Sequence, residues 1–131
     1  MIFTEQNSIS FFFAEVEFAA GRGTTGHEMN KRPDFILHKT GDGRKIGAKV
    51  VIEVKKDMKT TKEIDEAYEQ GLSYAKYGEA EVLVICDKRQ LRVYERNKKG
   101  KFEADASKCK RFSWEELQEL ENFNELKRLL S

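Results

Sequence analysis

The chain has 131 residues, of which 39% are hydrophobic and 36% charged, and this length and composition predict a single domain spanning residues 1–131. Its 24 basic and 23 acidic residues leave a net charge of +1, which gives no support for nucleic-acid binding by the molecule as a whole. No apolar run is long enough to span a bilayer, no secretory signal pattern is present, and Cys86 and Cys109 lack the spacing of a metal site. We therefore expect a reduced, cytoplasmic protein that does not contact membranes.

The N-terminal segment carries two ambiguous patterns. Residues 9–18 satisfy both the apolar stripe of a helix and the alternation of a strand, and we favour a strand for the second half. Residues 21–26 have the glycine spacing of a dinucleotide-binding loop, but no apolar helical period follows them. We interpret residues 21–26 as a flexible hairpin loop.

A hairpin of two strands is predicted next. Residues 34–38 and 49–55 have the composition of strands, and residues 40–45 between them have turn chemistry. Antiparallel pairing about the middle of this turn places Asp34 opposite Glu53, with their Cβ atoms about 5 Å apart. Both carboxylates could then reach the same ion.

The second strand of this hairpin has two different faces. Because side chains alternate along a strand, Glu53 and Lys55 share one face, and the even-numbered residues from Val50 to Val54 point into the core. Together with Asp34 they would gather two carboxylates and an ammonium, a set that suits Mg²⁺ and phosphate chemistry. The alternative is a surface aspartate beside a Glu–Lys ion pair, although an unpaired carboxylate in a buried strand would be costly.

A helix over residues 60–77 is indicated by two independent signals. Thr60 and Glu63 form a capping-box pattern, and apolar residues recur at helical spacing. Gln70 and Tyr74 lie one turn apart and are therefore adjacent on the helix surface, beside a glycine that would let the helix approach the sheet. The alternative is that Tyr74 is an aromatic residue at the edge of the core and Gln70 a solvated flank residue. The apolar face consists of Ile64, Ala67, Tyr68, Gly71, Leu72 and Ala75.

Two short strands, residues 82–86 and 91–94, follow this helix and are joined by a polar turn. The order of hairpin, helix and two strands predicts a mixed sheet with at least one βαβ connection. Ser113 and Glu116 form a second capping-box pattern, which begins a terminal helical segment with a break near residues 122–124. We expect the apolar stripe of this segment to pack against the sheet, and a partner-binding helix is the alternative.

Three segments carry a family resemblance: Arg32-Pro33-Asp34-Phe35-Ile36-Leu37, Val51-Ile52-Glu53-Val54-Lys55-Lys56 and Glu69-Gln70-Gly71-Leu72-Ser73-Tyr74-Ala75. They resemble the PD-(D/E)XK nuclease superfamily, and within it the N-terminal nuclease domain of type I restriction enzyme R subunits. The resemblance covers about residues 28–96. It implies an α/β fold with a restriction-endonuclease-like mixed β-sheet flanked by helices.

The same resemblance implies a metal-dependent DNA endonuclease domain that hydrolyses phosphodiester bonds as part of a restriction–modification system. In the family the Asp and Glu ligate the metal, the Lys assists hydrolysis, and the Gln and Tyr support the active site and the DNA contact. The implied partners are DNA, a helicase or translocase motor and methylase subunits, with a homodimer as a further option. The implied catalytic residues are Asp34, Glu53, Lys55, Gln70 and Tyr74, and the metal-binding positions for Mg²⁺ or Mn²⁺ are Asp34, Glu53 and Val54.

Two alternatives to a nuclease remain open. One is a catalytically inactive nuclease-fold module that binds nucleic acid or protein, and the other is a small structural α/β domain. The family normally supplies one more acid from an N-terminal helix, and the sequence does not choose among the four candidates Glu5, Glu15, Glu17 and Glu28.

Local patches are the remaining source of affinity for nucleic acid. One basic patch lies around the candidate site, and a second between Arg96 and Arg111 is expected to be solvated loop charge. His38 is expected on the same strand face as Asp34 and Ile36, where a partly exposed strand histidine is the simplest account. The patch around the site consists of Lys55, Lys56, Lys59 and Lys62.

Overall fold

The computed structural model describes residues 33–42 and 45–131. The predictions made for residues 9–18 and 21–26 lie outside the described residues. The elements in chain order are β1 (Phe35–Asp42), β2 (Lys45–Val54), α2 (Thr61–Tyr77), β3 (Val82–Cys86), β4 (Gln90–Glu95), β5 (Lys110–Ser113), the 3₁₀ turn η2 (Glu116–Gln118) and α3 (Leu120–Leu129).

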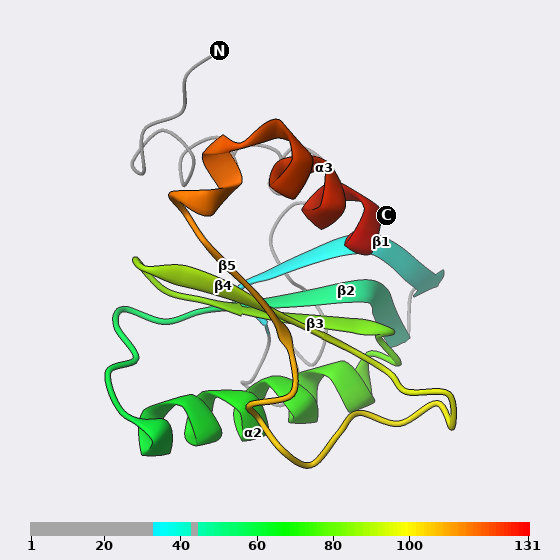
Figure 1. Cartoon of the computed structure of the whole chain (residues 1–131). Coiled ribbons are helices and arrows are strands. Elements are labelled where there is room, and N and C mark those ends of the chain that lie inside the picture. Colours follow the sequence, from blue (N-terminus) through cyan, green and yellow to red (C-terminus); the bar gives the residue numbers. More distant parts are fainter. Residues whose placement is uncertain (1–32, 43–44) are drawn as a thin grey trace.

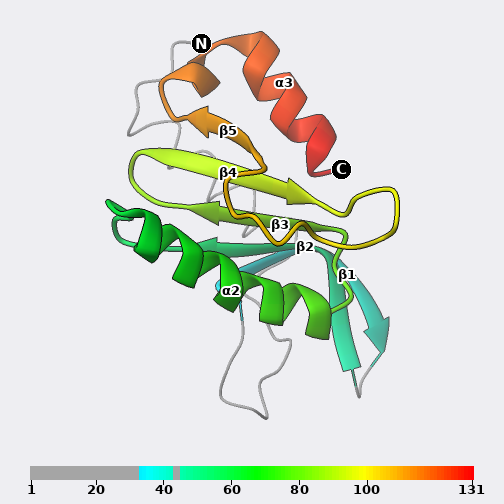
Figure 2. The same cartoon turned by 60° about the horizontal axis from the view of Figure 1, so that its bottom comes forward.

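The five strands form one mixed sheet in the order β1-β2-β3-β4-β5. β2 and β3 are parallel and are connected through α2, whereas the other three neighbouring pairs are antiparallel. Helix α2 covers one face of the sheet and α3 the other, which gives three layers (Figure 1). Figure 2 shows the same layers from another side. Residues 96–109, which connect β4 to β5, cross in front of the sheet in this view. The prediction of a mixed sheet flanked by helices, with a βαβ connection, is confirmed.

The hairpin has the predicted register, but its strands are longer than expected. Pairing runs without a shift from Asp42 and Lys45, next to the turn, to Phe35 and Ile52 at the open end. The prediction of a turn over residues 40–45 is wrong at both ends, because the polar and glycine residues flanking the turn still form antiparallel pairs. Turn chemistry in the sequence therefore marked the centre of the hairpin correctly and overstated the length of the turn.

Both faces of the sheet are buried, which corrects the prediction of one core face on β2. The even-numbered residues Val50 and Ile52 pack on the α3 side, as expected, but Val51 is also fully buried on the α2 side. A β2 strand with helices over both faces buries both sets of alternating side chains. The α3 side of the core also includes Val84, Leu91, Val93, Phe112, Trp114, Leu117 and Leu126, and the α2 side includes Ile36, Ala67, Tyr68, Leu83, Ile85 and Tyr94.

Helix α2 begins and docks as its sequence predicts. Thr60 and Glu63 form both hydrogen bonds of a capping box. Gly71 is buried against the sheet, where an added Cβ would lie 2.9 Å from a methyl carbon of Leu83. At the other end of the helix, the carbonyl of Gly78 accepts a hydrogen bond from the backbone N–H of Ala48 at 3.2 Å. These contacts fix α2 against β2 and β3.

The C-terminal part differs from the prediction in two respects. β5 is an additional edge strand of four residues, in which Lys110 and Arg111 are exposed, so its sequence has no apolar alternation to mark it. The terminal helical segment is interrupted at Glu119, where the backbone is extended, and not near residues 122–124. Ser113 and Glu116 do form the predicted reciprocal hydrogen bonds, each at 3.0 Å, but these begin the short turn η2. The apolar residues of α3 pack against the sheet, as expected.

None of the helices in residues 33–42 and 45–131 combines the length and the apolar character needed to cross a membrane.

Gly47 allows the end of α2 to approach β2, and this contact can be tested. A Cβ at Gly47 would collide with the carbonyl oxygen of Gly78 and lie 2.8 Å from Thr40 Oγ1. We expect Gly47→Ala to lower the free energy of unfolding by about 1–3 kcal/mol, measured by urea denaturation. Ser73→Ala, at an exposed position of α2, is the control and should stay within about 0.5 kcal/mol of the wild type. An equally small effect at Gly47 would contradict the tight helix–strand contact.

Candidate active site

Asp34 and Glu53 lie opposite each other at the open end of the β1–β2 hairpin. The observed register pairs Phe35 with Ile52, and one further step brings Asp34 opposite Glu53. Asp34 directly precedes β1, and its Oδ2 atom accepts a hydrogen bond from the backbone N–H of Val54 at 2.8 Å. Two carboxylates from neighbouring chain segments therefore meet at the edge of the sheet, as the hairpin pattern predicts.

Glu53 carries an unusual carboxylate because it is inside the core. The residue is 3% exposed, and its Oε1 atom has no hydrogen-bond partner among the described residues. Burial, followed by the nearby charge of Asp34, raises the pKa of Glu53 from 4.5 to about 7, while the charge of Lys55 acts in the opposite direction. The neutral form of this carboxyl is therefore favoured to a much higher pH than that of an exposed glutamate.

Lys55 connects Glu53 to helix α2. Its Nζ atom lies 3.8 Å from Glu53 Oε2, which is an ion pair longer than a hydrogen bond, and it donates a hydrogen bond to Gln70 Oε1. Gln70 in turn donates from Nε2 to the Tyr74 hydroxyl at 3.2 Å. The predicted adjacency of Gln70 and Tyr74 is confirmed, and α2 holds both beside Lys55.

The five residues named as catalytic from the sequence thus come together in one place. Their chemical roles stay predictions, and so does a metal contact at Val54, the last residue of β2. The four candidates for a further acid, at positions 5, 15, 17 and 28, lie outside the described residues.

His38 is exposed, as expected, but does not share a face with Ile36. Its Nε2 atom is hydrogen-bonded to the carbonyl oxygen of Leu130 at 2.8 Å, at the end of α3, whereas Ile36 packs on the α2 side. The backbone of His38 has a φ of 56°, so the regular alternation of the strand is broken at this residue. The expectation that His38 lies on the same strand face as Ile36 is therefore wrong.

The donor atoms of this site fit a hydrated divalent cation. Mg²⁺ takes one or two protein carboxylates and keeps several waters, a demand that Asp34 and Glu53 meet. The unpartnered Oε1 atom of Glu53 and the repulsion between the two carboxylates are both features that a bound cation would relieve. Residues 33–42 and 45–131 contain no group of three or more His, Cys, Asp or Glu side chains placed to hold a metal ion. The remaining sources of ligands are waters, backbone oxygens, substrate oxygens and the candidate acids that lie outside the described residues.

Comparisons of the chain with protein-family models, with curated proteins and with solved structures found no match. The chemistry of the site is therefore inferred from its own residues.

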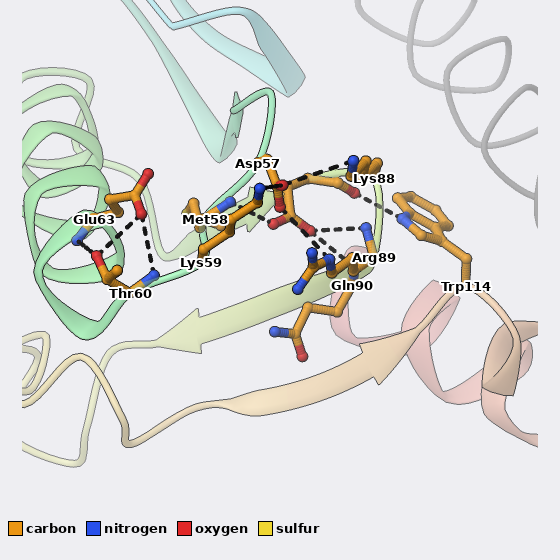
Figure 3. Close-up of polar contacts among 10 residues, drawn as sticks. Asp57, Met58, Lys59, Thr60, Glu63, Lys88, Arg89, Gln90 and Trp114 are labelled. Carbon is orange, nitrogen blue, oxygen red and sulfur yellow. Dashed lines mark hydrogen bonds and ion pairs between the residues drawn. The ribbon is translucent and has the colours of Figure 1, made fainter.

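Asp57 and Asp87, which the sequence did not mark as candidate site residues, organise a second polar cluster at the same edge of the sheet. Figure 3 shows Asp57 with the cations around it. Asp87 is 4% exposed, and its carboxylate accepts hydrogen bonds from the backbone N–H groups of Met58, Arg89 and Gln90. The sequence does hold a signal for both aspartates. Each lies just beyond the end of one of the two parallel strands and is followed within two residues by a basic residue.

The raised pKa of Glu53 predicts a specific pH dependence of stability. The carboxyl ionises near pH 4.5 in the unfolded chain and near pH 7 in the folded metal-free protein. Between these values the folded state binds more protons, so this group makes the protein less stable as the pH rises. Glu53→Gln removes that effect. We expect the variant to gain stability relative to the wild type between pH 4.5 and pH 8, by on the order of 3 kcal/mol.

The measurement is urea denaturation of both proteins in EDTA across this pH range. Glu69→Gln, at an exposed position of α2, is the matched control and should follow the wild-type curve. A stability difference between Glu53→Gln and the wild type that does not change with pH would show that Glu53 is not a strained carboxylate.

Proposed function

We propose that this chain is a metal-dependent DNA endonuclease domain of the PD-(D/E)XK type, similar to the nuclease domain of type I restriction R subunits. The observation that supports it most strongly is the meeting of Asp34 and Glu53 at one edge of the sheet, with Lys55 held beside them by α2. Two carboxylates and an ammonium in this arrangement suit hydrolysis of a phosphodiester bond.

Asp34 and Glu53 would hold the Mg²⁺ or Mn²⁺ ion, with the backbone of Val54 as a further proposed contact. Bound there, the ion would polarise the scissile phosphate and lower the pKa of a water molecule. Each of the two carboxylates is held in place by a different contact. Asp34 accepts a hydrogen bond from the backbone N–H of Val54, and Glu53 is held by its burial in β2.

Lys55 is the residue that would stabilise the negative charge developing on the phosphate or position the attacking water. Its side chain is 29% exposed, so its ammonium can reach a substrate at the surface of the site. Gln70 and Tyr74 act as positioning residues, because Gln70 accepts from Lys55 and donates to Tyr74. This chain of contacts limits the rotamers of Lys55 before substrate binds.

A second candidate function is a nuclease-fold module that binds nucleic acid or protein without cutting. One observation favours it: the pKa of Glu53 is about 7, so a metal ion must compete with a proton at neutral pH. A cleavage assay at pH 8 separates the two functions, since Glu53 is largely ionised there.

The resemblance to R subunits extends the proposal to partners. We infer that the domain works in the cytoplasm with a helicase or translocase motor and with methylase subunits. One Asp34–Glu53 site cuts one strand, so a double-strand break would require a homodimer or a second cutting event.

The direct test is incubation of the protein with supercoiled plasmid and linear DNA at pH 8, with Mn²⁺ or Mg²⁺. We expect nicking that EDTA abolishes and that Asp34→Ala and Lys55→Ala each reduce by at least about 100-fold, because each removes an electrostatic contact to the reacting phosphate or its metal. Lys99→Ala, an exposed lysine on the loop after β4, should leave the rate unchanged. DNA binding without cleavage would support the second candidate function, and neither binding nor cleavage would support a structural α/β domain.

A further inference from the structure

Five basic side chains lie on the two segments that follow the parallel strands. Residues 55–60 continue β2 and contain three lysines, and residues 87–90 continue β3 and contain Lys88 and Arg89. Because β2 and β3 are parallel neighbours, with Glu53 paired to Ile85, both segments emerge at the edge of the sheet that holds the candidate active site. Sequence reasoning includes the lysines after β2 in the basic patch around the site, but not Lys88 and Arg89.

Three of these cations converge on one carboxylate. Asp57 lies 3.6 Å from Lys59 Nζ, 3.7 Å from Lys88 Nζ and 3.6 Å from Arg89 Nε (Figure 3). The side chain of Asp57 is 15% exposed, whereas those of the three cations are 56–66% exposed. Asp57 and the buried Asp87 supply two negative charges against the three positive charges of these cations. Lysine and arginine side chains also carry three and five N–H donors. The cluster therefore presents uncompensated positive charge and free donors to the solvent.

Asp87 fixes the backbone from which these cations project. Its carboxylate accepts from Met58 N–H at 2.9 Å, which ties residues 55–60 to residues 87–90, and from the N–H groups of Arg89 and Gln90 within the turn. Its backbone carbonyl accepts a hydrogen bond from Trp114 Nε1 at 2.8 Å. The cations are thus carried on a rigid support, and their own side chains are not needed to hold it together.

We propose that Lys59, Lys88 and Arg89 form a phosphate-binding ridge that holds the backbone of a DNA duplex beside the Asp34–Glu53 site. This inference rests on the proposed function, since it names residues that would hold the substrate of that site. Several exposed cations on two adjoining segments can contact successive phosphates of a DNA backbone, because these phosphates are regularly spaced. Contacts to phosphates position a duplex without reading its sequence, so the ridge would act on any DNA.

A purely structural role for the three cations is the competing explanation. Exposed ion pairs contribute about 0–1 kcal/mol to stability, and the segments are already joined through Asp87. The Lys88→Ala/Arg89→Ala variant keeps the backbone N–H groups of positions 89 and 90, which both donate to the Asp87 carboxylate, so the turn should fold normally. The two explanations therefore predict effects on different measurements.

The experiment measures binding of fluorescein-labelled 25-base-pair duplexes of two unrelated sequences by anisotropy, in EDTA and from 0.05 to 1 M salt. Removing two phosphate contacts should reduce the slope of log affinity against log salt by about 2. At 0.1 M salt the Lys88→Ala/Arg89→Ala protein should therefore bind both duplexes about 10- to 100-fold more weakly than the wild type. Lys98→Ala/Lys99→Ala, which removes two exposed lysines beyond the opposite end of the sheet, is the matched control and should bind as the wild type does.

Equal loss of affinity in both double variants would overturn the inference, because only overall charge would then matter. A changed urea midpoint of Lys88→Ala/Arg89→Ala with unchanged affinity for the duplexes would also overturn it. The cations would then have only a structural role, as ion-pair partners of Asp57. Absence of duplex binding by the wild type would overturn it too. The proposed cleavage is judged by a separate measurement. Normal nicking by Lys88→Ala/Arg89→Ala would contradict the phosphate-binding ridge and leave the proposed nuclease activity intact. Duplex binding that depends on the ridge, without any nicking by the wild type, would support the ridge and contradict the nuclease activity.

Discussion

Glu53 places a carboxylate inside a sheet of apolar strands, and Asp34 lies opposite it, directly before the neighbouring strand. Desolvation and the repulsion between the two acids raise the pKa of Glu53 to about 7, and its Oε1 atom lacks a hydrogen-bond partner within the described part of the chain. Such a group makes the metal-free fold less stable than an apolar residue would. A divalent cation would supply the missing charge and the missing contact. The pair of acids that lowers the stability of the fold is thus the pair on which the proposed chemistry depends.

Elements built from neighbouring residues could be predicted from the sequence. The turn chemistry around residues 43–44 sets the hairpin register, and the register alone brings Asp34 opposite Glu53. Thr60 begins α2 because its side chain and that of Glu63 each bind the other residue's backbone N–H, an interaction contained entirely within four consecutive residues. The contact from Lys55 to Gln70 depends on how α2 docks, and the sequence did not predict it; it indicated only that Gln70 and Tyr74 lie on one side of the helix, within reach of the site.

Features set by distant packing could not be predicted. β5 is an exposed edge strand with too few apolar residues to show a pattern, and it pairs only because β4 offers a free edge. His38 changes face through a positive φ, which no local sequence rule requires of a histidine in a strand. Burial of Val51 follows from α2 covering a second face. The junction at Asp87 joins segments almost thirty residues apart, as its contact with Met58 N–H shows. The strands that meet at the edge were predictable, but the contacts between the loops beyond them were not.

We propose that Asp34 and Glu53 together bind one divalent cation. It is tested most directly by anomalous X-ray diffraction from crystals soaked in Mn²⁺ at pH 8, where Glu53 is largely ionised. We expect a single strong anomalous peak about 2.1 Å from one oxygen of each carboxylate, and we expect this peak to be absent in crystals of Asp34→Ala. Density that shows the two carboxylates turned apart, with no manganese between them at saturating concentration, would contradict it.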